Sequence, residues 1–184
     1  PWRWGNNLGL VVINSLLSRI AVPLTAVGAA ELCQSHGWGL FNAVVWPVWI
    51  EAVLCLLILD LAIYGQHVFF HLVPWLWRLH MVHHADMDID VTTGLRFHTF
   101  EILLSAIIKL AVVFVLAPSA VAVAIFEVLL NASSMFNHSN IRLPAGLDSN
   151  ARWLVVTPDM HRVHHSVIRS ESNQNFGFNL PWWD

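Results

Sequence analysis

The stretch EAVLCLLILDLAIYGQHVFFH, residues 51–71, joins an apolar run to two histidines spaced four residues apart. It overlaps a longer apolar stretch over residues 41–66, and a helix needs only about 20 mostly apolar residues to cross the hydrocarbon of a bilayer. On such a helix His67 and His71 lie one above the other on the same face. The stretch therefore predicts a membrane-spanning helix that presents two imidazoles at one end.

Three more apolar runs occur, over residues 8–30, 100–117 and 119–136. The last two adjoin at Pro118 and Ser119, which predicts a tight helical hairpin. Of the 184 residues, 57% are hydrophobic and 11% are charged, whereas soluble domains carry about 25% charged residues. We therefore expect an all-α integral membrane bundle of about four transmembrane helices. It forms a single domain over residues 1–184, which we expect to be a segment of a longer chain.

The positive charges lie on one side of this predicted bundle. If all four runs cross, the loops on the far side, residues 31–40 and 117–119, contain no lysine or arginine. Because Lys-rich and Arg-rich loops stay in the cytoplasm, the other side, with ten of the eleven histidines, is predicted to be cytoplasmic. A net charge of −3 and the lack of a basic tail exclude nucleic acid as an expected partner. The arginines on the predicted cytoplasmic side are Arg3, Arg78, Arg96, Arg142, Arg152, Arg162 and Arg169.

The motif His-x-Val-His-His occurs twice, as RLHMVHH at residues 78–84 and as DMHRVHH at residues 159–165. An imidazole that leaves water needs a hydrogen-bond partner or a metal, and one helical turn of each motif presents up to three. Zinc sites use at most four protein ligands, and haem needs isolated axial histidines. Eight or nine imidazoles instead suit two adjacent ions, with iron among the suitable metals. The count predicts a dinuclear site with the candidate ligands His67, His71, His80, His83, His84, His161, His164 and His165.

Other polar residues share faces with these histidines. Two precede His67 by three and seven residues, and a polar stripe on the last apolar run ends at His138. Carboxylates and phenols in such positions orient metal-binding imidazoles, and an ionisable residue inside a span is a functional-site candidate. The candidates for this supporting role are Asp60, Tyr64, Glu127 and Asn131.

The region after the second histidine motif leaves two alternatives open. His98 in RFHTFE is a further candidate ligand, or it begins the next helix with a hydrogen bond to Glu101. Asp86, Asp88 and Asp90 alternate with apolar residues. For these aspartates we favour a solvated loop over a role beside the metal.

The order His67-x-x-x-His71, His80-x-x-His83-His84 and His161-x-x-His164-His165 resembles the histidine boxes of the fatty acid hydroxylase and sterol desaturase superfamily. The similarity extends to TTGLRFHTFE at 92–101, FNHSN at 136–140 and NFGFNLPWWD at 175–184. The resemblance implies a membrane-bound, non-haem di-iron oxygenase in which the eight boxed histidines bind iron and His138 is a ninth ligand. Thr99 stands where bacterial relatives commonly have proline, which leaves the role of His98 open. Relatives also continue past the final WWD, so we expect a further C-terminal piece.

The resemblance also implies the reaction. Two ferrous ions and O₂ would oxidise an unactivated C–H bond of a lipid or sterol-like substrate, by hydroxylation or by desaturation. Electrons would come from an external donor, cytochrome b5-like or a ferredoxin with its reductase, because the chain has no flavin, haem or iron–sulfur motif. The bacterial branch looks nearer, which favours a bacterial inner membrane over the endoplasmic reticulum.

Two other classes remain open from the residues alone. One is a metal-dependent membrane lipid hydrolase or lyase, which would need fewer ligands and no reductant. The other is a non-enzymatic membrane metal-binding protein, which would need ligands along a path through the bilayer. Oxygen consumption coupled to a reductant distinguishes the oxygenase from both. The substrate, the carbon attacked, the electron donor and the oligomeric state do not follow from the sequence.

Overall fold

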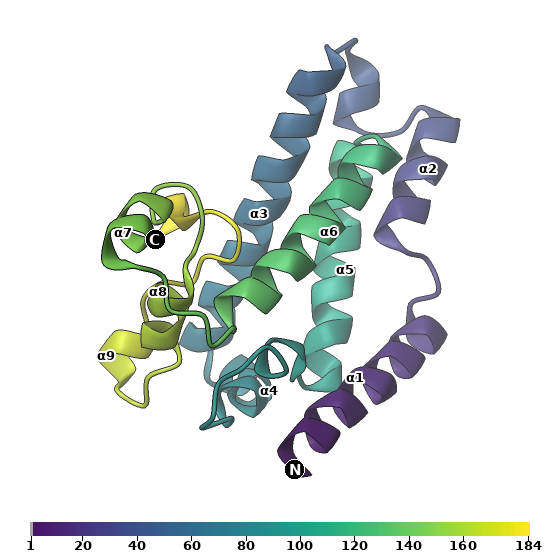
Figure 1. The fold of residues 1–184 in the computed structure, drawn as a ribbon. Helices are drawn as coiled ribbons and strands as arrows, with labels where there is room; N and C mark the ends of the chain where they lie inside the picture. Colours follow the sequence, from purple (N-terminus) through teal and green to yellow (C-terminus); the bar gives the residue numbers. More distant parts are fainter. Residues whose placement is uncertain (1) are drawn as a thin grey trace.

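The body of the molecule is a bundle of helices that run side by side (Figure 1). In the computed structural model, residues 2–184 are described, and every regular element in that range is helical. The bundle comprises α2 (Ala26–His36), α3 (Val48–Leu72), α5 (Thr99–Leu116) and α6 (Ala120–Asn137). Four segments are long and apolar enough to cross a membrane, namely residues 2–43, α3, α5 and α6. The predicted all-α membrane bundle is confirmed.

The first predicted span is not one continuous helix. Residues 8–30 are divided between α1 (Trp2–Ala21) and α2, and α1 lies oblique to the bundle helices (Figure 1). The break falls at Pro23, which lacks an N–H and disfavours the helical conformation of Val22. Thr25 then starts α2 by accepting a hydrogen bond from the backbone N–H of Gly28 at 3.0 Å. An apolar run therefore predicted the membrane segment but not its bend.

The core of the bundle lies between α2, α3, α5 and α6, towards the end opposite the histidine motifs. Small side chains allow the helix backbones to approach closely, as in other membrane bundles. Larger apolar side chains fill the remaining space. The fully or almost fully buried residues of this core include Ala29, Ala30, Cys55, Leu59, Val113, Ala122, Val123 and Phe126.

The predicted hairpin of the last two spans is confirmed. Helix α5 ends at Leu116, Ala117 takes the left-handed conformation (φ 53°), and Ser119 caps α6 by accepting from the N–H of Ala122. The loop after α2 passes close to this tip, because a Cβ atom on Gly39 would lie 2.4 Å from the Cβ of Ala117. Glycine at position 39 therefore lets α2 and the hairpin meet.

Short helices flank the opposite end of the bundle; in Figure 1, α4 lies below α3 and α6, and α7, α8 and α9 lie to the left of α3. Helix α4 (Pro74–His84) follows α3 after the single extended residue Val73, and proline at its first position suits a helix start. This sharp turn brings the second histidine motif back beneath the first. The remaining short elements are η1 (Leu40–Ala43), η2 (Thr93–Leu95), α7 (Ala145–Ala151), α8 (Pro158–His164), α9 (Arg169–Ser172) and η3 (Pro181–Trp183).

Candidate metal centre

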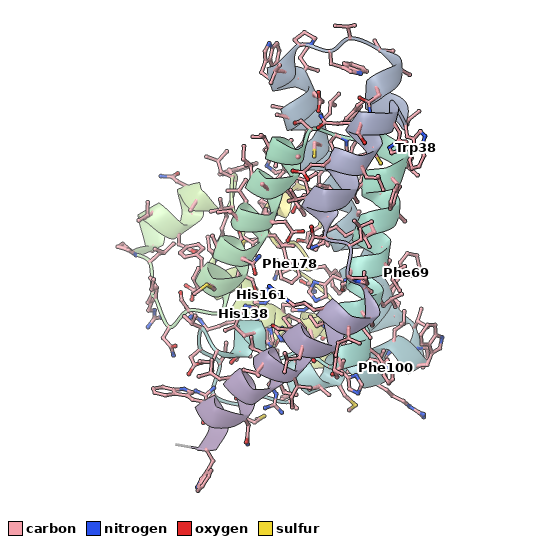
Figure 2. All side chains as sticks on the ribbon, turned by 90° about the vertical axis from the view of Figure 1, so that its right-hand side faces the viewer. Trp38, Phe69, Phe100, His138, His161 and Phe178 are labelled. Carbon is pink, nitrogen blue, oxygen red and sulfur yellow. The ribbon has the colours of Figure 1, made fainter. Side chains whose placement is uncertain are left out.

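Nine histidines from α3, α4, α8 and the end of α6 meet at this end of the bundle. They form two groups in which one nitrogen of each ring lies within 4.8 Å of those of the other members. The two groups adjoin, because the rings of His84 and His165 stack with centroids 4.3 Å apart. Figure 2 shows His138 and His161 beside Phe178 in the interior. The first group is His67, His71, His80, His84 and His164, and the second is His83, His138, His161 and His165.

The Nδ1 atoms of five of these rings donate outward to oxygen atoms. His67 donates to the carbonyl of Phe176 at 2.7 Å, and His164 donates to the carbonyl of Gln174 at 2.9 Å. A carbonyl only accepts, so the proton of each neutral ring resides on Nδ1 and the lone pair on Nε2. The other three outward bonds join His80 to Glu101, His83 to the carbonyl of Thr93 and His138 to the carbonyl of Ser134.

The Nε2 atoms of these same rings face one another. His67 and His164 bring theirs to 3.0 Å, and His83 and His138 bring theirs to 3.1 Å. Two lone pairs at this separation repel each other, because neither nitrogen carries a proton to share. A cation between them removes the repulsion, and neutral imidazole nitrogen is a good ligand for transition metals. The donor set therefore fits metal ions.

Several ring nitrogens also have no hydrogen-bond partner among the described residues. They include Nε2 of His71, Nε2 of His84, Nδ1 of His161 and both nitrogens of His165. Buried polar atoms without a partner carry a free-energy penalty. Metal coordination satisfies such a nitrogen without a proton donor, so these atoms support the same conclusion.

The chemical state of the rings suits this role. Burial lowers the pKa of His83, His161 and His164 well below the usual value, and neighbouring imidazoles lower it further. Burial also lowers the pKa of His138 to about 4. A low pKa keeps an imidazole neutral at physiological pH, with a lone pair free for a metal.

Glu101 is a site residue that the sequence prediction missed. Its carboxylate accepts a 2.6 Å hydrogen bond from Nδ1 of His80, and both side chains are buried. A carboxylate behind a metal-binding histidine fixes the ring's orientation and raises its basicity. Glu101 lies in the first turn of α5, 21 residues after His80, so only the fold reveals the pair.

The loop after α4 is ordered around Asp86, which corrects the predicted solvated loop. Asp86 is buried and accepts hydrogen bonds from Arg3, Asn7 and Thr93 at 2.8–3.0 Å. The carbonyl of Thr93 in turn accepts from Nδ1 of His83 at 3.1 Å. Helix α1 therefore supports the position of a candidate ligand through this loop. Asp88, by contrast, is exposed.

We expect Asp86→Asn to lower the free energy of unfolding by about 2–3 kcal/mol, because a hydrogen bond to a charged group contributes about 1.5–3 kcal/mol. The matched control is Asp88→Asn in the same loop, which is expected to change stability by less than about 0.5 kcal/mol. Thermal unfolding in detergent measures both. Equal effects of the two substitutions would show that the buried hydrogen bonds of Asp86 do not contribute to the free energy of unfolding.

Asp60 supports the site indirectly. It is buried in α3 and accepts hydrogen bonds from Asn179 at 2.7 Å and from the indole of Trp183 at 2.8 Å. These bonds hold the C-terminal segment against α3, and the carbonyl of Phe176 in that segment orients His67. Asp60 therefore does not contact an imidazole directly, as its predicted supporting role would require. It influences the orientation of His67 through the backbone of residues 176–183.

The other three predicted supporting residues make different contacts. The ring of Tyr64 packs edge-on against Phe176, with centroids 6.4 Å apart. Glu127 pairs with Lys109 of α5 at 2.7 Å, and Asn131 donates to the backbone carbonyl of Glu127. Glu127 therefore contacts α5, and Asn131 contacts its own helix. None of the described hydrogen bonds of these two side chains reaches a histidine.

His98 belongs to neither histidine group. It is the residue before α5, where its Nδ1 accepts a 3.2 Å hydrogen bond from the N–H of Phe100. Its ring also stacks on that of Phe100, and Phe100 is exposed. Of the two open alternatives, the geometry matches a residue that begins the helix, although its partner is Phe100 rather than Glu101.

We therefore expect His98→Ser to leave the metal content unchanged, because serine also caps helices well. His98→Leu removes the cap and is expected to lower the free energy of unfolding by about 1 kcal/mol, again without metal loss. Elemental analysis and thermal unfolding of the two purified variants check both statements. A loss of metal in His98→Ser would make His98 a ligand.

Comparisons with known proteins agree with this geometry. The model of the fatty acid hydroxylase family matches residues 52–184, a range that includes every histidine of both groups. The match confirms the resemblance that the histidine boxes indicated. Arg3 and Asn7 lie outside the matched range.

Three curated relatives illustrate the similarity. Ornithine lipid hydroxylase OlsE of Rhizobium tropici is 33% identical over 76% of this chain and 41% of its own length. Alkylglycerol monooxygenase of Xenopus tropicalis is 29% identical over 76% of this chain and 29% of its own length. Cholesterol 25-hydroxylase of Rattus norvegicus is 27% identical over 73% of this chain and 44% of its own length. The chain thus spans less than half of each relative, and no solved structure matches it.

Proposed function

The chain belongs to the fatty acid hydroxylase family, and from that premise we propose that it uses O₂ and a pair of iron ions to oxidise a C–H bond of a membrane lipid. The observation that carries the proposal is the division of nine histidines, eight of them buried and His84 half-buried, into groups of five and four. Each group has enough nitrogens for one ion, and iron accepts imidazole ligands. When bound, the two ions supply O₂ activation and C–H cleavage.

The protein's own residues do the remaining work. His67, His71, His80, His84 and His164 would hold one ion, and His83, His138, His161 and His165 the other. Glu101 and the carbonyls of Phe176, Gln174, Thr93 and Ser134 accept from the Nδ1 atoms of five of these rings and so keep the Nε2 atoms of those five rings directed inward. Burial of the rings excludes water, which would otherwise compete for the ligand positions and for reactive oxygen species.

The substrate is a lipid. The three relatives are named for ornithine lipid, alkylglycerol and cholesterol, which share a long apolar part and little else. Hydroxylation inserts one oxygen atom of O₂ into the C–H bond and releases the other as water, with two electrons and two protons from outside. Desaturation consumes the same electrons and releases both oxygen atoms as water. An external electron-donor protein, cytochrome b5-like or a ferredoxin with its reductase, would supply them.

A direct test combines the purified protein with a lipid extract, a chemical reductant and O₂ labelled with a heavy isotope. Hydroxylation places the label in a lipid, as mass spectrometry of the extract would reveal. Desaturation gives an unlabelled lipid that has lost two hydrogens. Lipid turnover that continues without O₂ or reductant would instead point to the hydrolase or lyase. Stable metal binding with no lipid change under any condition would point to a non-enzymatic protein.

We also propose that the histidine end faces the cytoplasm, in a bacterial inner membrane. The arginine asymmetry of the loops supports the orientation, and the Rhizobium relative supports a bacterial setting. Ser149→Cys introduces an exposed thiol in α7, in the segment that follows the last predicted span, while both native cysteines are buried. A membrane-impermeant thiol reagent should label it only after the cells are opened. Labelling in intact cells would show that the histidine end faces away from the cytoplasm.

A further inference from the structure

A cavity of about 720 Å³ adjoins the histidine site, between the end of α3, helix α4 and the segment 165–173. Its lining includes His71 and His84 of the first histidine group and His165 of the second. These rings carry nitrogens without hydrogen-bond partners among the described residues. The inner end of the cavity therefore lies beside ring nitrogens that would hold the two proposed ions.

The cavity walls and rim are largely apolar. Trp77 packs against both His71 and His84, with ring centroids 5.0 and 5.3 Å apart. Leu72 and Val167 line the cavity and are 58% and 85% exposed. Large apolar side chains exposed together mark a surface that meets another apolar phase. The rim of the cavity thus suits the interface of a membrane, where a lipid can enter from the side.

Two arginines, Arg78 and Arg169, line the same cavity, and no carboxylate does. Both are exposed. Neither forms an ion pair within residues 2–184, whereas Arg3, Arg152 and Arg162 each pair with an aspartate. A cavity that joins apolar walls to two uncompensated positive charges is complementary to an amphiphile with an anionic head.

The volume limits what the cavity can hold. Pockets for small molecules measure roughly 300–1,000 Å³, so this one accommodates a headgroup and the adjoining part of one chain rather than a whole lipid. The rest of the lipid would remain in the bilayer beside Leu72 and Val167.

We propose that this cavity is the substrate site and that it selects lipids with a carboxylate or phosphate group, which Arg78 and Arg169 bind. The inference rests on the proposed function, because it assumes that the lipid approaching the histidines is the one oxidised. It adds the class of headgroup, which the histidine site does not specify. Binding of the anion also holds the chain in the orientation in which it reaches the inner end of the cavity.

The test measures binding of three amphiphiles with one chain and different heads, namely palmitate, hexadecyl phosphate and hexadecanol. The iron-loaded protein is titrated in an uncharged detergent, and bound amphiphile is counted by native mass spectrometry. We expect both anions to bind at least about tenfold more tightly than hexadecanol, since charge-assisted hydrogen bonds are the strong ones. Arg78→Gln and Arg169→Gln are each expected to weaken binding of the anions about tenfold and to leave hexadecanol unaffected.

The matched control is Arg142→Gln, which removes an exposed arginine outside the cavity lining and is expected to leave all three affinities unchanged. Equal affinities for the three heads, or equal losses in Arg142→Gln and Arg78→Gln, would overturn the proposal. Displacement of hexadecyl phosphate by an equal concentration of inorganic phosphate would also overturn it, since the site would then take a free anion rather than a lipid.

Iron content and lipid oxidation are measured on the same samples. Selective anion binding without oxidation would leave the site standing and reject the proposed reaction.

Discussion

Replacing His164 with alanine should reduce lipid oxidation by more than about 100-fold. The ring is buried, its Nε2 faces that of His67 at 3.0 Å, and its Nδ1 is held by the carbonyl of Gln174. Loss of a partner that merely orients a ligand costs about 10–100-fold in metal affinity or activity, and loss of the ligand itself removes more. His83→Ala should have the same effect through the second group of histidines. Turnover and metal content of the purified variants are the measurements.

The control for both substitutions is His36→Ala. His36 is exposed at the end of α2, where it packs on Trp38, so the variant should retain full activity and metal. Because alanine also leaves a cavity, His164→Gln is a second variant that fills more of the space. Both His164 variants should insert into the membrane and elute as the unmodified protein does. Near-normal turnover in either variant would show that His164 is not a metal ligand.

Glu101→Gln is expected to lower metal affinity by about 10–100-fold, the usual effect of removing the partner behind a metal-binding histidine. The neutral amide can still accept a hydrogen bond from His80, but it no longer raises the basicity of the ring as the carboxylate does. The side chain keeps its size, so the helix packing around the first turn of α5 is preserved. Chelator competition against the loaded protein measures the change in affinity.

Glu31→Gln is the matched control, because Glu31 is exposed on α2 at the other end of the bundle. It should leave metal affinity unchanged. Glu101→Asp retains the charge but shortens the side chain, so it should retain more affinity than Glu101→Gln if the charge matters more than the reach. Unchanged affinity in Glu101→Gln would make the 2.6 Å contact with His80 a packing contact only.

Much of the fold follows from local patterns in the sequence. Long apolar runs predicted the membrane segments, and Pro118 with Ser119 predicted the hairpin between α5 and α6. The bend at Pro23 was present in the sequence as well, but mean hydropathy averages over it. A proline inside an apolar run should therefore be weighed as a helix break even where the run is long enough to span.

The candidate site was predictable for a different reason. Spacings of three and four residues place the rings of one motif on one helical face, so eight histidines of the two groups could be named from the motifs, and the family resemblance added His138. Their partners could not. His80 meets Glu101, His83 meets the carbonyl of Thr93, and His67 meets that of Phe176, which lies 109 residues away.

These partners escaped prediction because carbonyls have no signature in a sequence, and two of the four backbone acceptors, Phe176 and Gln174, belong to a loop. A third, Thr93, belongs to the short helix η2. Helical periodicity pointed instead to residues on the same helix, such as Asp60 and Glu127. Asp60 holds the C-terminal segment, and Glu127 pairs with Lys109. Residues that orient a ligand are thus found where separate elements meet, and periodicity within one helix does not locate them.

The most direct test of the dinuclear site is the metal content per chain. The protein would be expressed in iron-sufficient medium, purified in mild detergent and analysed for all transition metals, beside His83→Ala. We predict about two iron ions per chain, as in other dinuclear sites, and a marked loss of iron in the variant. Haem iron, or a single zinc ion that survives the substitution, would contradict a pair of iron ions held by these nine histidines.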